Sequence, residues 1–208
     1  MLQENAVEPG TLSLLESLMV MPELKSCNLV RGTALALKFG HRLSVDLDLF
    51  STEKLGVNLI VLALQNKFGK DFQYEKTNVK WAVFCYINGI KVDVVNYPHV
   101  QLDATENHGL LRLYTNKDIA AMKINAILGR GAKKDFYVLV ELLTVFSLKE
   151  IIGFYEKKYP NQMFLVSLST AITYFDDAET DADPIALKGQ TWEQVKKTLQ
   201  FHVREYLK

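Results

Sequence analysis

The first 70 residues alternate between helical and extended patterns of apolar positions. TLSLLESLMV, residues 11–20, and EKLGVNLIVLALQNKFG, residues 53–69, carry apolar residues at helical spacing. Between them, residues 27–30 are predicted to form a short buried strand and residues 34–39 a short helix that Gly40 ends. This part of the chain is therefore expected to mix helices and strands.

From residue 72 to residue 97 the period changes to that of β-strands. FQYEKT (72–77), KWAVFCYI (80–87) and IKVDVVNY (90–97) are alternating runs, and Asn88-Gly89 separates the last two. An Asn-Gly pair between two such runs predicts a hairpin. The polar stretch DATENHG that follows, residues 103–109, is expected to be a loop.

The remainder of the chain has helical spacing, apart from one acidic stretch, DDAETDADPIALKG (176–189), which is predicted to be a mobile surface loop. The pattern predicts an α+β fold. We expect a small mixed β-sheet domain with flanking helices over residues 1–110, and a helical domain over residues 111–208 that completes a cleft. The predicted helices of this second part are residues 116–129, 132–146, 148–159, 162–175 and 192–207.

Two aspartates interrupt the apolar run HRLSVDLDLFS, residues 41–51. In an extended strand Asp46 and Asp48 share one face, so their carboxylates are neighbours. Neighbouring carboxylates beside a core need a cation, a proton or hydrogen-bond donors to compensate them, and Mg²⁺ is a suitable cation. A short Asp-x-Asp pattern also occurs where both side chains are simply solvated, so its context has to decide.

Two further features place this pair in a chemical context. Gly32 and Thr33 are expected to form a turn that opens a helix, which would direct backbone N–H groups toward an anion such as a phosphate. Asp93, in the strand IKVDVV, can lie beside Asp46 and Asp48 in a mixed sheet. Three carboxylates with a phosphate-binding turn are typical of two-metal nucleotidyl transfer.

Composition and charge narrow the class of protein. The 208 residues contain 24 Lys and Arg and 24 Asp and Glu, so the formal net charge is zero and a nucleic-acid partner would need a local basic patch. We expect no membrane partner and no sequence-specific reading of DNA. The acidic N-terminal region is unlike a signal peptide, and Cys27 and Cys85 fit neither a zinc site nor a disulfide framework. These features favour a soluble cytoplasmic protein.

Three segments together resemble a known family. RGTALALKFGHRLSVDLDLFS, KVDVV and IAAMKINAILGRGAKKDF are similar to segments of the AbiEii/AbiGii-type toxin nucleotidyltransferases, including the MenT-like proteins, of the DNA polymerase beta superfamily. The resemblance covers roughly residues 28–143. It implies transfer of a nucleoside monophosphate from an NTP to an acceptor hydroxyl with Mg²⁺, by a toxin that is paired with an antitoxin. The acceptor stays open between the 3′ end of a tRNA and a small molecule.

The resemblance also implies roles for individual residues. Asp46, Asp48 and Asp93 would hold Mg²⁺, and Gly32 and Thr33 would cradle the triphosphate. The residues that would line the nucleotide or acceptor groove are Arg42, Ser44, Lys123, Arg130 and Lys134, with Asp135 orienting them. Without the resemblance, Lys123, Arg130, Lys133 and Lys134 would read as the solvated side of two helices.

Two positions depart from the family pattern. Arg31 stands where members have the first glycine of the turn, and Val138 stands where they often have a second aspartate after Lys-Asp. Arg31 can either contact the phosphates or pair with Asp46 or Asp48 and neutralise them. The second outcome gives an alternative function, in which a catalytically weakened protein of the same fold acts as a binding or regulatory partner.

Overall fold

A mixed β-sheet of seven strands forms the centre of the computed structural model, which describes residues 2–74, 78–162 and 167–208. β2 runs parallel to β5 and β1 runs parallel to β7, whereas the other neighbouring strands are antiparallel. The parallel pair β2–β5 therefore lies well inside the sheet. The strands in spatial order are β3 (Phe72–Tyr74), β4 (Ala82–Ile87), β5 (Ile90–Asn96), β2 (Leu47–Ser51), β1 (Asn28–Leu29), β7 (Leu111–Leu113) and β6 (Glu106–His108).

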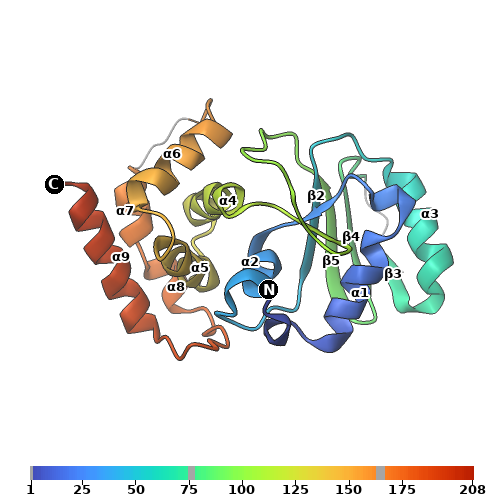
Figure 1. The fold of residues 1–208 in the computed structure, drawn as a ribbon, viewed down its shortest axis with the longest axis horizontal. Coiled ribbons are helices and arrows are strands. Elements are labelled where there is room, and N and C mark those ends of the chain that lie inside the picture. Colours follow the sequence, from blue (N-terminus) through green and yellow to red (C-terminus); the bar gives the residue numbers. More distant parts are fainter. Residues whose placement is uncertain (1, 75–77, 163–166) are drawn as a thin grey trace.

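Helices cover the two sides of the sheet unequally. α1 (Pro9–Met19) and α3 (Val57–Phe68) lie on one side, and α2 (Arg31–Phe39) lies on the other side together with the helices of the second half (Figure 1). These helices are α4 (Asn116–Gly129), α5 (Lys133–Leu143), α6 (Leu148–Lys158), α7 (Leu168–Thr173), α8 (Asp176–Glu179) and α9 (Trp192–Tyr206). After β7, the named elements in the described part of the chain are thus all helices.

Local sequence signals account for most of these element ends. Asn88 and Gly89 have φ values of 54° and 77°, as a two-residue hairpin turn between β4 and β5 requires. Gly40, at φ 60°, ends α2 in the left-handed conformation. α6 and α9 each begin with a capping box, in which an N-cap hydroxyl and a side chain three residues later satisfy backbone N–H groups reciprocally.

The structure confirms the predicted α+β fold class and corrects it in three places. The stretch predicted as a loop, residues 103–109, contains β6, which pairs with β7. The acidic stretch 176–189, predicted to be a mobile loop, begins with α8. The helix predicted over residues 162–175 is present as α7 over Leu168–Thr173, and residues 163–166 lie outside the described ranges, as do residues 75–77 of the predicted strand FQYEKT.

One continuous hydrophobic core joins the sheet to the helices of the second half. The core includes Leu49 and Val94 on the central strands and Ile119 and Leu139 on α4 and α5, all fully buried. β7 lies beyond residue 110 and still belongs to the sheet. A division of the chain into domains at residue 110 stays a prediction.

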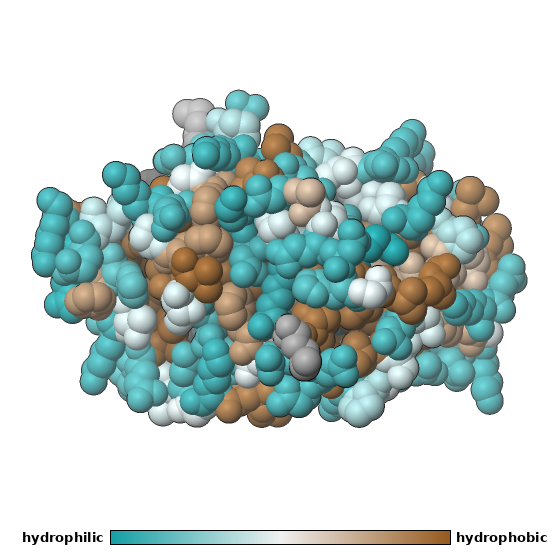
Figure 2. All heavy atoms as spheres, viewed as in Figure 1, coloured by the Kyte–Doolittle hydropathy of each residue, from teal (hydrophilic) through white to brown (hydrophobic). Residues whose placement is uncertain are grey.

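The face shown in Figure 2 is mostly hydrophilic, with hydrophobic side chains in small patches between the polar ones. Within residues 2–74, 78–162 and 167–208, every helix is too short or too polar to cross a lipid bilayer.

A buried ion pair ties the helical half to the loop that leaves β5. Lys158 Nζ lies 2.7 Å from Asp118 Oδ1 and also donates to the Val100 carbonyl, and both charged side chains are fully buried. Asp118 accepts further hydrogen bonds from the backbone N–H groups of Leu102 and Asp103. Lys158 and these two N–H groups therefore converge on one carboxylate, which fixes α4 and α6 relative to the sheet.

We predict that Lys158→Met destabilises the protein by about 3–5 kcal/mol, because it leaves the Asp118 carboxylate buried without its cation. Urea unfolding measures this change. Lys157→Met is the matched control, since Lys157 is the exposed neighbour on α6, and it should cost far less. Equal effects of the two substitutions would show that the ion pair does not hold the helices.

Candidate functional site

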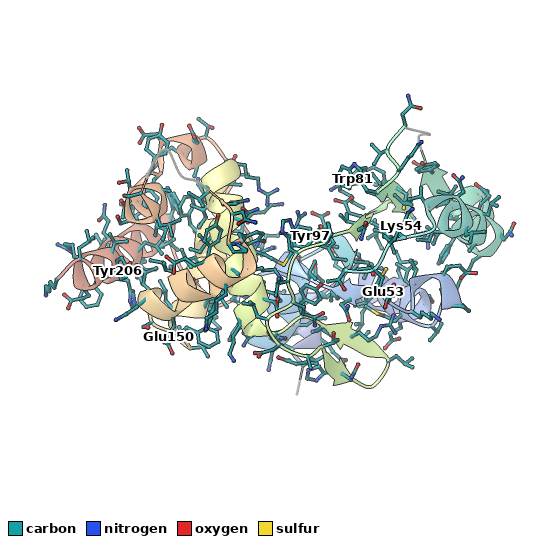
Figure 3. All side chains as sticks on the ribbon, turned by 90° about the horizontal axis from the view of Figure 1, so that it is seen from above. Glu53, Lys54, Trp81, Tyr97, Glu150 and Tyr206 are labelled. Atoms are coloured by element: carbon teal, nitrogen blue, oxygen red, sulfur yellow. The ribbon has the colours of Figure 1, made fainter. Side chains whose placement is uncertain are left out.

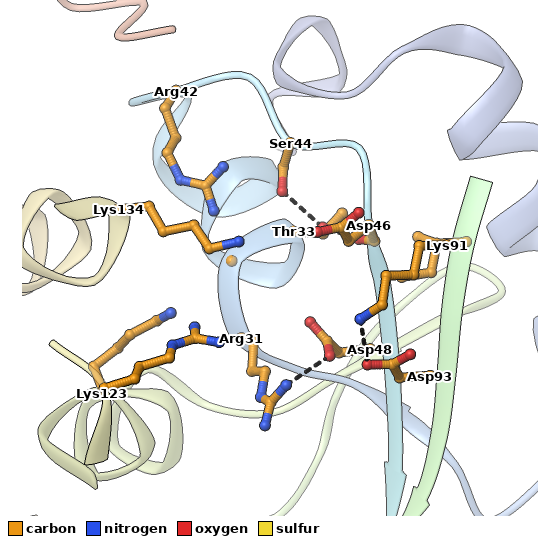
Figure 4. A pocket seen from close by; sticks show the side chains of 13 residues that line it. Arg31, Thr33, Arg42, Ser44, Asp46, Asp48, Lys91, Asp93, Lys123 and Lys134 are labelled. Carbon is orange, nitrogen blue, oxygen red and sulfur yellow. Dashed lines mark hydrogen bonds and ion pairs between the residues drawn. The ribbon is translucent and has the colours of Figure 1, made fainter. Parts of the chain in front are cut away.

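Segments from both halves of the chain meet at a pocket of about 470 Å³. The start of β2 and the middle of β5 form one wall, and α2, α4 and the first turn of α5 form the other. Figure 4 shows Asp46, Asp48 and Asp93 on the sheet side, with Lys123 and Lys134 opposite them. The pocket thus brings together residues that are up to 103 positions apart in the sequence, from Arg31 to Lys134.

The carboxylates lie on one face of the central strands. Asp48 on β2 and Asp93 on β5 are direct partners in the parallel register, so their side chains are neighbours. Asp46 lies two residues before Asp48, in the segment that leads into β2. Burial raises the pKa of Asp48, the Arg31 charge opposes this, and the Asp93 charge raises the pKa further. The like charges on this face therefore need compensation.

Arg31 and Lys91 supply positive charge that compensates these carboxylates. Arg31 Nη1 lies 2.9 Å from Asp48 Oδ1, and its guanidinium lies over the Phe50 ring at 4.8 Å. Lys91 Nζ lies 2.8 Å from Asp93 Oδ2. The other carboxylate oxygen of Asp93, Oδ1, is buried and has no hydrogen-bond partner among the described residues.

Lys91 is a site residue that the sequence reasoning missed. It stands two positions before Asp93 on β5, so the same alternation that places Asp93 on the site face places Lys91 there too. The pattern Lys-x-Asp within a strand was the available signal.

The start of α2 differs from the expected turn. Gly32 and Thr33 lie in the first helical turn rather than in a loop before it, and Arg31 is the first helical residue with φ 60°. Such a left-handed conformation suits glycine and costs an arginine about 1–2 kcal/mol. A side chain at Gly32 would collide with the guanidinium of Arg42, so the glycine leaves room for Arg42 in the pocket.

Thr33 holds the segment that carries the first aspartate. Its hydroxyl donates to the Asp46 carbonyl and lies 2.8 Å from Ser44 Oγ. Thr33, Ser44 and Asp46 are thus linked, and all three line the pocket (Figure 4). The Thr33 hydroxyl therefore positions the backbone segment that leads into β2.

Asp135 holds two cations of the opposite wall. Its Oδ1 lies 2.8 Å from Lys123 Nζ, and its Oδ2 lies 3.0 Å from Arg130 Nε, two of the groove residues that the resemblance implied. Burial acts to raise the pKa of Asp135, but the two cations outweigh it and hold the pKa at about 2. Burial lowers the pKa of Lys123, and Asp135 opposes this shift. Asp135 stays ionised and fixes both side chains at neutral pH.

Two neighbouring lysines in the first turn of α5 point in different directions. Lys134 lines the pocket and is exposed, whereas Lys133 is buried and pairs with Asp183 at 3.0 Å. Lys133 also donates to the Asp181 carbonyl, so Lys133 does not belong to a solvated side of the helix. Val138 is fully buried in the core and is not a pocket residue.

The pocket carries an excess of positive charge. Six cationic side chains and three carboxylates line it. Among the described residues, no three His, Cys, Asp or Glu side chains converge closely enough to hold a metal ion as they stand. The internal cations Arg31 and Lys91 occupy the positions beside the carboxylates instead.

We predict that the melting temperature of Arg31→Gly, measured relative to the wild type, rises as the pH falls from 7.5 to about 5. At pH 7.5 the loss of the ion pair with Asp48 and the relief of the left-handed backbone strain at position 31 offset each other. The pKa of folded Asp48 is raised, so its protonation at lower pH removes the uncompensated charge and favours the folded state. Thermal melts over this range measure the effect. In an Asp48→Asn background the same substitution should show no such pH dependence. A difference in melting temperature between Arg31→Gly and the wild type that does not change with pH would contradict the pairing of Arg31 with Asp48.

Comparisons with known proteins place the chain. No family model matches its sequence. It is 32% identical over 210 residues to aq_aa25 of Aquifex aeolicus (strain VF5), an uncharacterised protein, and the match covers 92% of this chain and 95% of that one.

Two solved structures share the fold at 15% sequence identity and a TM-score of 0.54 each. One is a candidate nucleotidyltransferase from H. pylori, for which the match covers 97% of this chain and 99% of that one. The other is MenT4, a nucleotidyltransferase toxin of Mycobacterium tuberculosis H37Rv, with 90% and 79% covered. The chain therefore belongs to one family with aq_aa25, and its fold is that of the MenT-like nucleotidyltransferases.

Proposed function

We propose that this protein transfers a nucleoside monophosphate from an NTP to an acceptor hydroxyl. The observation that carries the proposal is the pocket in which cations from α2, α4 and α5 face the carboxylates of β2 and β5. Cations neutralise the charge of a triphosphate, and carboxylates beside the reacting phosphorus can hold the metal ions of the reaction. The nucleotidyltransferase fold of the chain agrees with this reading.

The triphosphate would lie against the cationic wall. Lys134 projects into the pocket without a carboxylate partner among the described residues (Figure 4). Arg42 is buried beside Gly32, and its Nε has no hydrogen-bond partner within the described part of the chain. Lys123 and Arg130 are held in place by Asp135. These cations, together with the N-terminus of α2, form an anion site.

The carboxylates fit Mg²⁺ in their chemistry. Asp46, Asp48 and Asp93 offer hard oxygen ligands, and the buried Oδ1 of Asp93 lacks a partner that a cation would supply. Burial raises the pKa of Asp48, and a bound cation would counteract this. When bound, Mg²⁺ would stabilise the charge on the attacking and leaving oxygens. A bound Mg²⁺ would compete with Arg31 for Asp48 and with Lys91 for Asp93.

The reaction itself is a displacement at the α-phosphorus. The acceptor oxygen forms a bond to that phosphorus, the bond between the α-phosphorus and the bridging oxygen breaks, and pyrophosphate leaves with the electron pair. Asp93 takes the proton of the acceptor hydroxyl. Lys123, Arg130 and Lys134 neutralise the charge that accumulates on the pyrophosphate.

The biological setting follows from the fold relatives. MenT4 is a nucleotidyltransferase toxin. Together with the family resemblance of the sequence, this leads us to propose that the chain is the toxin component of a toxin–antitoxin pair, with an RNA such as the 3′ end of a tRNA as acceptor. A small-molecule acceptor is the competing assignment.

A separate observation supports a second candidate function. The Arg31–Asp48 ion pair neutralises a metal ligand, and Arg31 stands at a position whose left-handed backbone favours glycine. Under this proposal the site is closed by its own side chain, and the protein acts as a binding or regulatory partner. The effect of removing Arg31 separates the two functions.

We predict that the double substitution Asp46→Ala/Asp48→Ala abolishes Mg²⁺-dependent NTP binding. Isothermal titration calorimetry with each of the four NTPs, with Mg²⁺ and with EDTA, measures the affinity. The control is Asp176→Ala/Asp177→Ala, which removes two exposed aspartates on α8 and should leave binding unchanged. Wild-type affinity in the site variant would refute the assignment.

We predict that Arg31→Gly increases the affinity for Mg²⁺ and NTP by about fivefold, because a half-exposed ion pair contributes roughly 1 kcal/mol against which the metal competes. The same calorimetric titration applies, with Arg204→Ala on the exposed side of α9 as the control. A loss of affinity would instead make Arg31 a phosphate ligand. An unchanged affinity would show that Arg31 neither competes with the metal nor binds the phosphates.

A further inference from the structure

A tyrosine on β4 lies beside the carboxylates, on the side away from the cationic wall. Tyr86 is 48% exposed and is the direct antiparallel partner of Lys91 on β5. Register partners share a face of the sheet, and Asp93 follows Lys91 by two residues, so Tyr86 stands on the face that carries Asp93. Diagonal neighbours across two strands are about 7–8 Å apart, which long side chains can span. The Tyr86 phenol is therefore within reach of Asp93.

The hollows around Tyr86 lead to the same carboxylates. One hollow, over β3 and β4, is lined by Tyr86 and Lys91 together with Asp93. Another hollow, beside the turn between β4 and β5, is lined by Tyr86 and Lys91 together with Asp46. Tyr86 thus lines two open approaches to the acidic side of the pocket.

The helical half leaves this part of the sheet uncovered. Seen from above in Figure 3, Trp81, which precedes β4, lies on the sheet half, away from the helices that carry Glu150 and Tyr206. Phe84, the register partner of Asp93, is 39% exposed. The face of β4 that adjoins the site is therefore accessible.

The other hydroxyl groups that line the site are already engaged. Those of Thr33 and Ser44 lie 2.8 Å apart in buried positions, and Thr33 also donates to the Asp46 carbonyl. The hydroxyl of Tyr97, at the edge of the site, shares a hydrogen bond with that of Tyr159. These groups hold the fold around the pocket.

Tyr86 differs from the other tyrosine of its hollow. Tyr74 on β3 is the register partner of the buried Cys85, so it belongs to the core face of the sheet. Strand alternation turns Tyr86, the next residue after Cys85, to the opposite face. Within residues 2–74, 78–162 and 167–208, no hydrogen bond holds the Tyr86 hydroxyl. This phenol is free to approach a ligand.

The order of the strands places Tyr86 opposite a leaving pyrophosphate. β5, with Asp93, lies between β4 and β2. Lys123 and Lys134, which are proposed to hold the triphosphate, lie across the pocket from the carboxylates (Figure 4). In phosphoryl-type transfer the attacking and leaving oxygens lie roughly in line through the phosphorus. A phenol that approaches from β4 meets this requirement.

We propose that Tyr86 is itself an acceptor, so that the protein transfers a nucleoside monophosphate to its own tyrosine. The phenol oxygen forms a bond to the α-phosphorus, the bond between that phosphorus and the bridging oxygen breaks, and pyrophosphate leaves with the electron pair. Asp93 takes the phenol proton. The product is a phosphodiester between Tyr86 and a nucleoside. This inference rests on the proposed nucleotidyl transfer and goes beyond it, because it names an acceptor within the chain.

Self-modification restricts the site. A nucleotide on Tyr86 occupies the hollow that Asp93 lines and adds a negative charge beside Lys91. A second acceptor then loses access to Asp93. The modified protein is therefore a slower transferase than the unmodified one.

Incubation of the purified protein with Mg²⁺ and each of the four NTPs, radiolabelled at the α-phosphate, tests the proposal. Digestion with trypsin releases residues 81–91, WAVFCYINGIK, in which Tyr86 is the only residue with a hydroxyl group. We expect label in this peptide and a mass increase of one nucleoside monophosphate. Label from an NTP that is marked at the γ-phosphate instead would show a different reaction and contradict the proposal.

Tyr86→Phe keeps the ring and removes the hydroxyl, so this peptide should lose its label completely. Tyr206→Phe is the matched control, because Tyr206 is a 41% exposed tyrosine near the end of α9 (Figure 3), and this variant should be labelled as the wild type is. Since the transfer occurs within one chain, Asp46→Ala/Asp48→Ala should stay unlabelled when it is mixed with the wild type. Label on that variant would show transfer between copies and overturn the proposed geometry.

The outcomes separate this inference from the proposed function. Mg²⁺-dependent NTP binding in calorimetry, together with an unlabelled peptide 81–91, overturns the self-modification and leaves the proposed transfer standing. Label that persists in Tyr86→Phe lies on another residue and also overturns the assignment to Tyr86. A protein without any Mg²⁺-dependent NTP binding refutes the proposed transfer itself.

Discussion

Everything in the site depends on the repulsion between carboxylates that two neighbouring parallel strands place side by side. Asp48 and Asp93 are register partners on β2 and β5, partly or fully removed from water, and burial already raises the pKa of Asp48. Such an arrangement persists in a folded protein only when cations compensate it. The chain uses Arg31 and Lys91 for this, and each contacts one carboxylate. A bound cation would do the same, so the internal ion pairs and an external metal compete to compensate the same two carboxylates.

The opposite wall is organised by a second buried carboxylate. Asp135 holds Lys123 and Arg130 across the pocket, and the Asp118–Lys158 pair fixes the helices that carry them. The sheet half supplies the acids, and the helical half supplies Lys123, Arg130 and Lys134 of the pocket cations. Both halves are needed to form the pocket, and one continuous core holds them together.

The sequence predicts the acidic wall better than the cationic one. Strand alternation and the Asn88-Gly89 hairpin suffice to place Asp46, Asp48 and Asp93 on one face, because a period of two leaves only two choices. On α5, successive residues point about 100° apart, so periodicity could not tell that Lys134 faces the pocket while Lys133 pairs with Asp183. β6 exists because it pairs with β7, and three polar residues carry no local signal for that. The sequence allows Arg31 either to contact the phosphates or to pair with Asp46 or Asp48. Only the folded backbone at the start of α2 brings its guanidinium to Asp48.

The competition between internal and bound cations can be observed directly. A crystal structure with Mg²⁺ and a non-hydrolysable NTP analogue should have Arg31 and Lys91 withdrawn from Asp48 and Asp93, with both carboxylates on the metal and the triphosphate against Arg42 and Lys134. An analogue bound in this pocket while Arg31 remains on Asp48 would contradict the account.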